Sequence, residues 1–215
     1  MPIESSHSRA MKSKSLFGSA VAMMALVVVA PLLLVVGFAI RVTMGSPILF
    51  RQVRAGLNSR PFRLIKFRSM KGGGTSVISS TDDERRLTGL GRFLRATSID
   101  ELPSLWNVVR GEMTLVGPRP LLMEYLPLYS DTQAKRHEAL PGLTGWAQVN
   151  GRNAISWEEK FNFDVWYVEN RTPLIDAKIL LMTIKTVFSR RGISQSGHAT
   201  MPPFGGSHPV ADEVN

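Results

Sequence analysis

An uncharged apolar segment of 26 residues, 15–40, is the strongest constraint on how this chain of 215 residues can fold. As a continuous helix it would be about 39 Å long, enough to cross a hydrocarbon core of about 30 Å. A secretory signal peptide is excluded because the segment is too long, and because no small-x-small cleavage site follows it before Arg41. The segment therefore predicts a membrane helix.

The flanks of this segment bear on how it sits in the membrane. Three basic residues precede it, and eight lie in 41–71 with no acid before Asp82. Short basic flanks prefer the cytoplasmic side, and a single span would place one of them outside. Pro31 lacks an amide donor and can kink the helix, and each half is too short to cross alone. The residues alone leave two alternatives open: a re-entrant helix–break–helix and a Pro-kinked span.

The net charge of +9 is concentrated at the N-terminal end. Residues 1–81 hold 11 Lys and Arg and a single acid, Glu4, whereas residues 82–215 hold 15 basic and 16 acidic residues. Beside an apolar anchor, such basic residues are favoured next to an anionic leaflet by about 1 kcal/mol each. A basic membrane-anchored nucleic-acid-binding protein is the alternative that this charge alone would allow.

Cysteine and histidine usage excludes several kinds of site. The chain has no Cys, which excludes a disulfide framework, a thiolate zinc site and a cysteine nucleophile. The four His residues show no metal-ligand spacing.

Beyond the anchor, the pattern predicts a mixture of short strands and helices. Strands are expected at 48–53 and 62–67, and helices at 83–95 and from Ser98, where Ser-x-x-Glu matches a capping box. Asn150-Gly151 predicts a tight hairpin turn. Residues 174–191 predict an amphipathic helix, either a core helix or one lying along the bilayer surface. Its apolar stripe consists of Leu174, Ala177, Leu180, Leu181, Ile184, Val187 and Phe188.

Few residues could carry chemistry. Asp100 and Glu101 are expected in a first helical turn, where the dipole and free amides favour ionised carboxylates. An ionised Asp could bind a divalent cation or attack phosphorus, or both acids could simply cap the helix. Arg119 lies between Pro118 and Pro120 on restricted backbone, which suits a phosphate ligand. A Gly-rich segment ends at Arg152 but lacks the P-loop Gly-Lys-Ser/Thr.

Taken in order, these segments resemble the bacterial monotopic polyprenyl-phosphate phosphoglycosyl transferases. The similarity rests on KFRSM at 66–70, LRATSIDELPSLWNV at 94–108, GEMTLVGPRP at 111–120 and PGLTGWAQVNGRN at 141–153. Three further segments, LLMEYL at 121–126, NAISW at 153–157 and GHAT at 197–200, are most similar to the diacetylbacillosamine 1-phosphate transferases. The resemblance extends from about residue 12 to about residue 205.

The resemblance implies a reaction and a set of roles. Members transfer a sugar 1-phosphate from a UDP-sugar to undecaprenyl phosphate and release UMP, with Mg²⁺ as cofactor. It implies that Asp100 is the nucleophile of a covalent phosphosugar intermediate and that Glu101 assists it. We expect Asp100 also to bind Mg²⁺. Charge at a phosphoryl transition state must be offset by cations, so Lys66, Arg95, Arg119 and Arg152 are expected to bind phosphate.

We therefore expect a mainly helical α+β monotopic membrane protein with a small cytoplasmic catalytic domain. Residues 1–14 would form a basic flank, 15–41 a re-entrant helix with its break at Pro31, 42–191 the catalytic domain and 192–215 an irregular tail. The expected location is the bacterial inner membrane, among its phospholipids, with the domain on the cytoplasmic face. Nucleic acid is not an expected partner. The sugar would be UDP-N,N′-diacetylbacillosamine, with galactose, glucose or GalNAc as alternatives; a structural membrane adaptor is the remaining rival.

Overall fold

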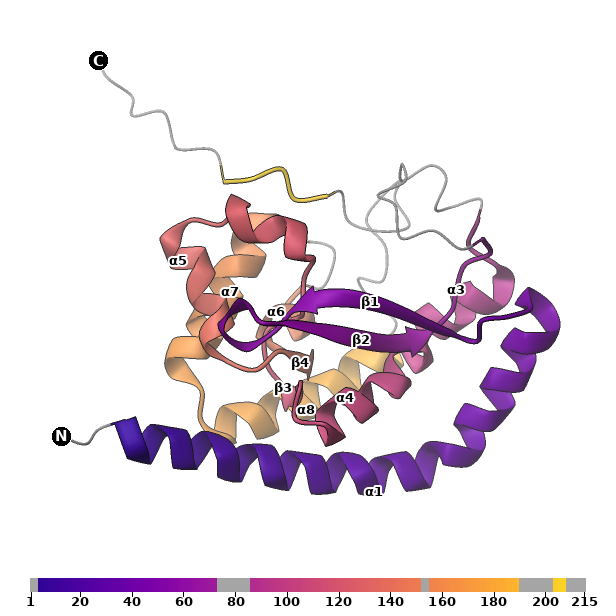
Figure 1. The fold of residues 1–215 in the computed structure, drawn as a ribbon, viewed down its shortest axis with the longest axis horizontal. Coiled ribbons are helices and arrows are strands. Elements are labelled where there is room, and N and C mark those ends of the chain that lie inside the picture. The colour runs from indigo at the N-terminus through magenta and orange to yellow at the C-terminus, as the bar shows by residue number, and fades with distance from the viewer. Residues whose placement is uncertain (1–3, 73–85, 152–154, 190–202, 208–215) are drawn as a thin grey trace, which may run out of the picture.

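The computed structural model describes residues 4–72, 86–151, 155–189 and 203–207. In these residues the chain is mostly helical, as the sequence predicts, and it has two small two-stranded sheets, of which the sequence predicted one. Figure 1 shows the long N-terminal helix passing along the outside of a domain that contains the remaining helices and strands.

Helix α1 (Glu4–Met44) contains the whole apolar segment and has Pro31 in its interior. The helix bends strongly but continues through the proline without an interruption (Figure 1). In place of a helix–break–helix, the structure thus has one strongly bent helix, and its re-entrant placement in a membrane stays a prediction. The missing amide and the ring of Pro31 weaken the backbone bonding locally, which permits a kink without ending the helix.

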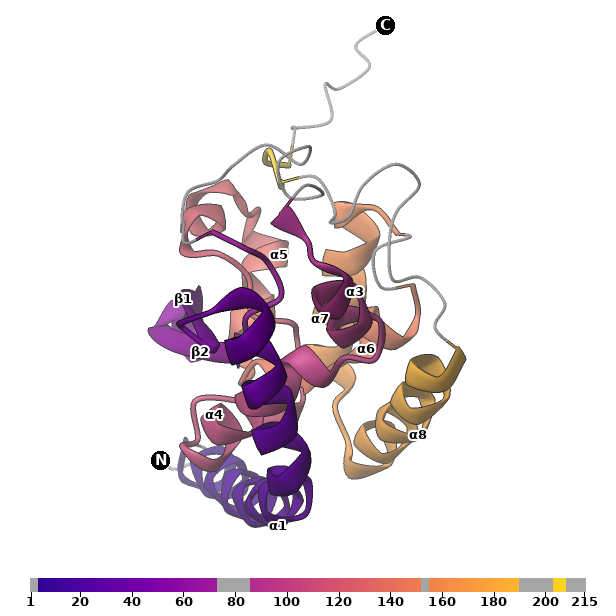
Figure 2. The same cartoon turned by 90° about the vertical axis from the view of Figure 1, so that its right-hand side faces the viewer.

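The two limbs of α1 pack on different parts of the domain. Before Pro31, Ala22 lies in a core cluster with Leu64 and Leu105. After Pro31, Val36 and Ile40 pack in a second cluster with Phe67 and Leu94. The bend thus lets one helix follow the curvature of the domain, and Figure 2 shows both limbs against it. Apolar side chains on the other side of the helix are exposed, namely Met24, Val27, Val28, Leu34, Val35, Phe38 and Val42.

The antiparallel hairpin of β1 (Leu49–Ala55) and β2 (Pro61–Phe67) confirms the two predicted strands. A short 3-10 helix, η1 (Leu57–Ser59), connects them. The register pairs Phe50 with Lys66, and alternate residues of a strand share a face. Gln52 and Arg54 therefore lie on the same face of the hairpin as Lys66, while Arg51 lies on the other.

The region after the hairpin is built from three short helices: α3 (Gly89–Ala96), the 3-10 helix η2 (Ile99–Ser104) and α4 (Leu105–Val109). The helix expected at 83–95 begins only at Gly89, capped by Thr88, and 83–85 lie outside the described residues. The capping box predicted at Ser98 is wrong. Ser98 has a left-handed backbone (φ 58°) and its side chain makes no capping bond.

A small parallel sheet joins β3 (Thr114–Val116) to β4 (Gly142–Thr144). The backbones approach closely, because a Cβ on Gly142 would lie 2.1 Å from the amide nitrogen of Gly117. The hairpin turn predicted at Asn150-Gly151 is wrong. Residues Trp146–Val149 form helix α6, and the Asn150 side chain donates to the Trp146 carbonyl oxygen at its end, so this Asn terminates a helix.

The remaining elements cover the small sheet and the hairpin. They are η3 (Met123–Leu128), α5 (Asp131–Ala134), η4 (Lys135–Glu138), α7 (Trp157–Asn170) and α8 (Pro173–Ser189). Helix α8 confirms the helix expected at 174–191. Its Ile179 is buried in a core cluster, whereas the predicted apolar stripe turns outward: Leu174, Leu180, Leu181 and Ile184 are exposed.

Candidate active site

Helices η2 and α4 are held against the edge of strand β2 by buried polar side chains. Ser104 donates to the Ile65 carbonyl oxygen at 2.7 Å, and the Asn107 carbonyl oxygen accepts from the Ile65 amide at 3.1 Å. The Asn107 amide group also donates to the Arg63 carbonyl oxygen at 2.8 Å. These bonds replace a neighbouring strand and fix Asp100 and Glu101 relative to Lys66 on β2.

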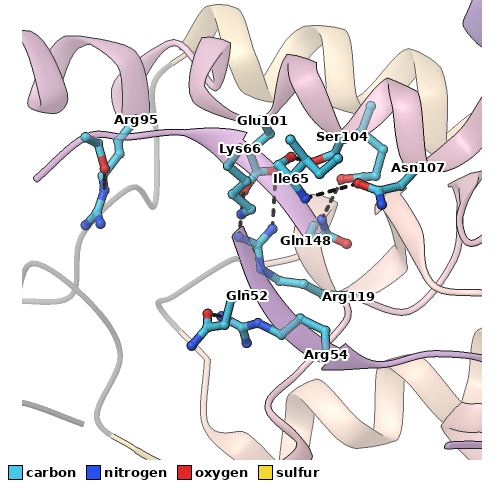
Figure 3. A network of polar contacts seen from close by, with 12 residues as sticks. Gln52, Arg54, Ile65, Lys66, Arg95, Glu101, Ser104, Asn107, Arg119 and Gln148 are labelled. Carbon is cyan, nitrogen blue, oxygen red and sulfur yellow. Dashed lines mark hydrogen bonds and ion pairs between the residues drawn. The ribbon is translucent and has the colours of Figure 1, made fainter. Parts of the chain in front are cut away.

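Glu101 is the acceptor of a three-residue ion network (Figure 3). Lys66 Nζ donates to its Oε1 at 2.7 Å and Arg119 donates to the same oxygen at 2.6 Å. Burial alone would raise the pKa of Glu101, but the charges of Arg119 and Lys66 hold it well below its usual range. Glu101 is therefore ionised at neutral pH and is committed to positioning the two cations.

Asp100, the neighbour of Glu101, is in a different environment. It is 8% exposed and accepts no hydrogen bond from the residues that the structure describes. Burial, together with the negative charge of Glu101, raises the pKa of Asp100 to about 6, against the opposing effect of Lys66 and nearby arginines. At neutral pH this carboxylate is ionised and still has its lone pairs available.

Arg95 lies in the last turn of α3. It donates to the Ser69 hydroxyl at 3.0 Å, and its charge opposes the rise in the pKa of Asp100. The approach of α3 to this strand end requires Gly91, because a Cβ there would lie 1.8 Å from the Ser69 carbonyl oxygen. The structure thus places Arg95 near Asp100, as predicted.

The Gly-Pro-Arg-Pro segment is anchored from beneath by a buried ion pair. Arg136 donates to Asp164 at 2.6 Å, with side-chain exposures of 1% and 2%, and also to the Arg119 carbonyl oxygen at 2.7 Å. The Pro118 carbonyl oxygen accepts from the Gly142 amide at 2.9 Å. Pro118 and Pro120 also line a small cavity below the loop. The backbone that carries Arg119 is therefore fixed by the Arg136 side chain and by the amide of Gly142.

The structure brings together five of the predicted residues: Asp100, Glu101, Lys66, Arg95 and Arg119. Arg152 lies outside the described residues. Sequence reasoning missed the polar residues that support this group, namely Arg54, Ser104, Asn107, Arg136 and Asp164. Ser104 and Asn107 could have been found as polar residues spaced by three within an apolar helical segment; the others are brought in by long-range contacts.

This arrangement suits chemistry at a phosphoryl group. A buried ionised carboxylate can attack an electrophile or ligate a cation, and the surrounding cations can stabilise negative charge that develops beside it. Within the described residues no three His, Asp or Glu side chains are gathered as a metal cage. Mg²⁺ commonly needs only one or two carboxylates together with substrate phosphates, and Asp100 fits that requirement.

Comparison with known proteins gives a consistent picture. A family model described as "Bacterial sugar transferase" matches residues 9–190, which include every site residue named above. The chain is 55% identical over 172 residues to the uncharacterized sugar transferase EpsL of Bacillus subtilis, covering 80% of this chain and 85% of that protein.

Two further relatives have named activities. The chain is 40% identical over 179 residues to the UDP-galactose-lipid carrier transferase of Erwinia amylovora, covering 75% of this chain and 37% of that protein. It is 37% identical over 169 residues to the UDP-glucose:undecaprenyl-phosphate glucose-1-phosphate transferase of Klebsiella pneumoniae, covering 74% and 36%. This chain thus spans little more than a third of the length of these two relatives.

Proposed function

The chain belongs to the bacterial sugar transferase family, and we propose that it transfers a sugar 1-phosphate from a UDP-sugar to undecaprenyl phosphate, with Asp100 as the nucleophile. UMP is the first product and a polyprenyl-diphosphate sugar the second. The named activities of the Erwinia and Klebsiella relatives support this substrate class.

The contrast between Asp100 and Glu101 carries the proposal. Glu101 is occupied by Lys66 and Arg119, so it serves as their anchor. Asp100 is free of such bonds among the described residues and lies among the same cations. Its pKa is raised to about 6, so Asp100 is still ionised at pH 7. A carboxylate that is desolvated but unbonded is more reactive than one held in an ion pair.

The reaction has two displacement steps at one phosphorus atom. A carboxylate oxygen of Asp100 attacks the phosphorus that bears the sugar, and the bond from that phosphorus to the UMP oxygen breaks. A phosphate oxygen of the lipid then attacks the same phosphorus, and the bond to Asp100 breaks. Arg119 and Lys66 lie where they can offset the negative charge of both steps. Glu101 holds them there without taking part in bond formation.

We propose Mg²⁺ as the cofactor, held by Asp100 together with substrate oxygens. When bound, the cation would neutralise part of the diphosphate charge and so lower the repulsion that an anionic attacker meets. Lys66, Arg95 and Arg119 would neutralise the remainder from the protein side.

The exposed apolar surfaces support a membrane location. Helix α1 has one candidate membrane segment, Gly18–Met44, and its outer face is apolar and exposed. Helix α8 also presents Leu174, Leu181 and Ile184 outward. Surfaces of this kind bind to a bilayer through buried apolar area. We propose that α1 enters and leaves the inner membrane from the cytoplasmic face, that α8 lies along its surface, and that the domain is cytoplasmic.

The identity of the sugar rests on sequence resemblance. The segments at 121–126, 153–157 and 197–200 favour UDP-N,N′-diacetylbacillosamine, whereas the relatives with named sugars act on galactose and glucose. We propose the diacetylated sugar, and a panel of UDP-sugars tests it. Highest turnover with a plain hexose would contradict this assignment without affecting the reaction class.

One assay tests the reaction itself. Purified protein in detergent or nanodiscs is given undecaprenyl phosphate, Mg²⁺ and each UDP-sugar in turn, and released UMP is measured. We expect release with at least one UDP-sugar, loss of release with EDTA, and background rates for Asp100→Asn. Absence of UMP release from every UDP-sugar by the wild-type protein would contradict the proposed function.

A further inference from the structure

Arg54 is a cation of the hairpin that the backbone brings next to the active site. The amide of its neighbour Ala55 donates to the Leu121 carbonyl oxygen at 3.1 Å, which ties β1 to the residues directly after Gly-Pro-Arg-Pro. Figure 3 shows Arg119 between Glu101 and the pair formed by Gln52 and Arg54. The hairpin register places Arg54 on the same face as Lys66.

The guanidinium of Arg54 has no anionic partner among the described residues. One terminal nitrogen donates to the neutral side chain of Gln52 at 2.6 Å, while Nε is buried and makes no hydrogen bond. Glu101, whose negative charge acts on Arg54, is bonded to Lys66 and Arg119 instead. A buried donor without an acceptor and a charge without a counter-ion are both costly, and a bound anion is one arrangement that would offset both costs.

The charges around Arg54 favour an anion beside it. Burial, followed by repulsion from Arg119, lowers its pKa to about 10. An anion between the two guanidinium groups would remove that repulsion and would accept from the unbonded Nε. Phosphate is the anion whose oxygens match a guanidinium fork in geometry and charge.

We propose that Arg54 and Arg119 together bind a phosphate group of a substrate, with Gln52 positioning Arg54. This inference rests on the proposed function. Arg119 is bonded to Glu101, the neighbour of the nucleophile. Arg54 lies on the side of Arg119 that faces away from Glu101. The phosphate in question is therefore one that does not itself receive the attack of Asp100. Two substrates carry such a group: the nucleotide, whose UMP phosphate leaves, and the polyprenyl phosphate.

The test compares Arg54→Gln with Arg51→Gln, an exposed arginine of the same strand on the opposite face. Binding of UMP and of uridine is measured by calorimetry or ligand-induced thermal shift on the full chain, and KM for undecaprenyl phosphate is measured separately. Uridine lacks the phosphate, so a lost phosphate contact changes the ratio of the two affinities, whereas a general distortion of the site changes both. Arg54→Lys, which keeps the charge but not the fork, serves if Arg54→Gln does not fold.

If the nucleotide is the source of the phosphate, Arg54→Gln weakens UMP binding by about ten- to a hundredfold and leaves uridine binding unchanged. If the lipid is the source, KM for undecaprenyl phosphate rises by a similar factor and UMP binding is unchanged. Arg51→Gln changes neither. Unaltered UMP affinity and lipid KM in a folded Arg54→Gln protein that still releases UMP would overturn this inference alone. A wild-type protein that neither binds nor releases UMP would instead overturn the proposed function.

Discussion

The carboxylate of Glu101 accepts bonds from Lys66 and Arg119 at 2.7 and 2.6 Å, while the adjacent Asp100 accepts none from the residues that the structure describes. The two acids consequently respond in opposite ways to their surroundings. The pKa of Glu101 is held below its usual range by the two cations, and that of Asp100 is raised to about 6 by burial and by Glu101. This difference leads to predictions for each residue.

Asp100 should destabilise the folded protein at neutral pH. Because its folded pKa of about 6 lies above the ordinary Asp pKa of 3.8, its contribution to stability is fully present below about pH 3.8 and is lost as the pH rises through about 6. Asp100→Asn removes this dependence and should be more stable than wild type at pH 7 by up to roughly 3 kcal/mol. Urea unfolding of the wild type and of Asp100→Asn at pH 5 and pH 7 measures this difference in stability. A variant that is equally destabilised at both pH values would contradict the buried, unbonded carboxylate.

The rate of UMP release should depend on the ionisation of Asp100. Since only the carboxylate form attacks phosphorus, kcat/KM should fall as the pH decreases through about 6, which is the pKa of this group in the free enzyme. Measurement of kcat/KM for the UDP-sugar between pH 5 and pH 8 tests this. A profile that stays flat through that range would rule out Asp100 as the titrating nucleophile.

Glu101→Gln should impair both stability and turnover. The substitution keeps the size of the side chain but leaves Lys66 and Arg119 without their counter-ion, at a cost of roughly 2–4 kcal/mol. Turnover should fall because the two cations are no longer held beside Asp100. The matched control is Glu169→Gln, whose ion pair with Lys135 is exposed at both side chains and lies outside the site. Unchanged kcat in a folded Glu101→Gln protein would show that the network has no positioning role.

The buried pair of Arg136 and Asp164 should be worth far more than a surface pair. Asp164→Asn leaves a buried guanidinium unpaired and should cost roughly 3–5 kcal/mol. Glu169→Gln breaks the exposed pair with Lys135 and should cost less than about 1 kcal/mol. Thermal unfolding of the two variants makes the comparison. Because Arg136 also holds the Arg119 carbonyl oxygen, Asp164→Asn should lower kcat as well. Equal stability losses in the two variants would contradict the burial.

The re-entrant arrangement of α1 can be tested in a chain that has no cysteine of its own. Lys14→Cys and Arg51→Cys should both resist an impermeant thiol reagent added to intact cells and both react in inverted membrane vesicles. Val28→Cys, on the exposed outer face of α1, should be protected in both preparations by lipid. Labelling of Lys14→Cys in intact cells would establish a spanning helix instead.

Local sequence patterns predicted β1, β2, α1 and α8, whose signals are local, but not β3, β4 or α7. One comparison shows the limit of such patterns. Ser-x-x-Glu occurs at 98–101 and at 156–159, and only Ser156 and Glu159 form a capping box. At the first position Glu101 is taken by Lys66 and Arg119, which are 35 and 18 residues away. Tertiary ion pairing therefore overrides the local signal there.

The candidate site was predictable to a similar degree. Asp100, Glu101 and Arg119 lie in segments that resemble a known family, so the motifs indicated them directly. Arg54 has no local signal, because its place beside Arg119 depends on a backbone contact between β1 and Leu121. Such a contact forms only when residues more than sixty positions apart are brought together by the fold.

The covalent intermediate is the central claim, and intact-mass spectrometry tests it most directly. The wild-type protein is incubated with UDP-sugar and Mg²⁺ in the absence of lipid acceptor. We expect release of UMP in about one-to-one ratio with enzyme and a mass increase of one sugar phosphate on the peptide that contains Asp100. Asp100→Asn should show neither. An unmodified wild-type mass, together with an active Asp100→Asn protein, would contradict the account.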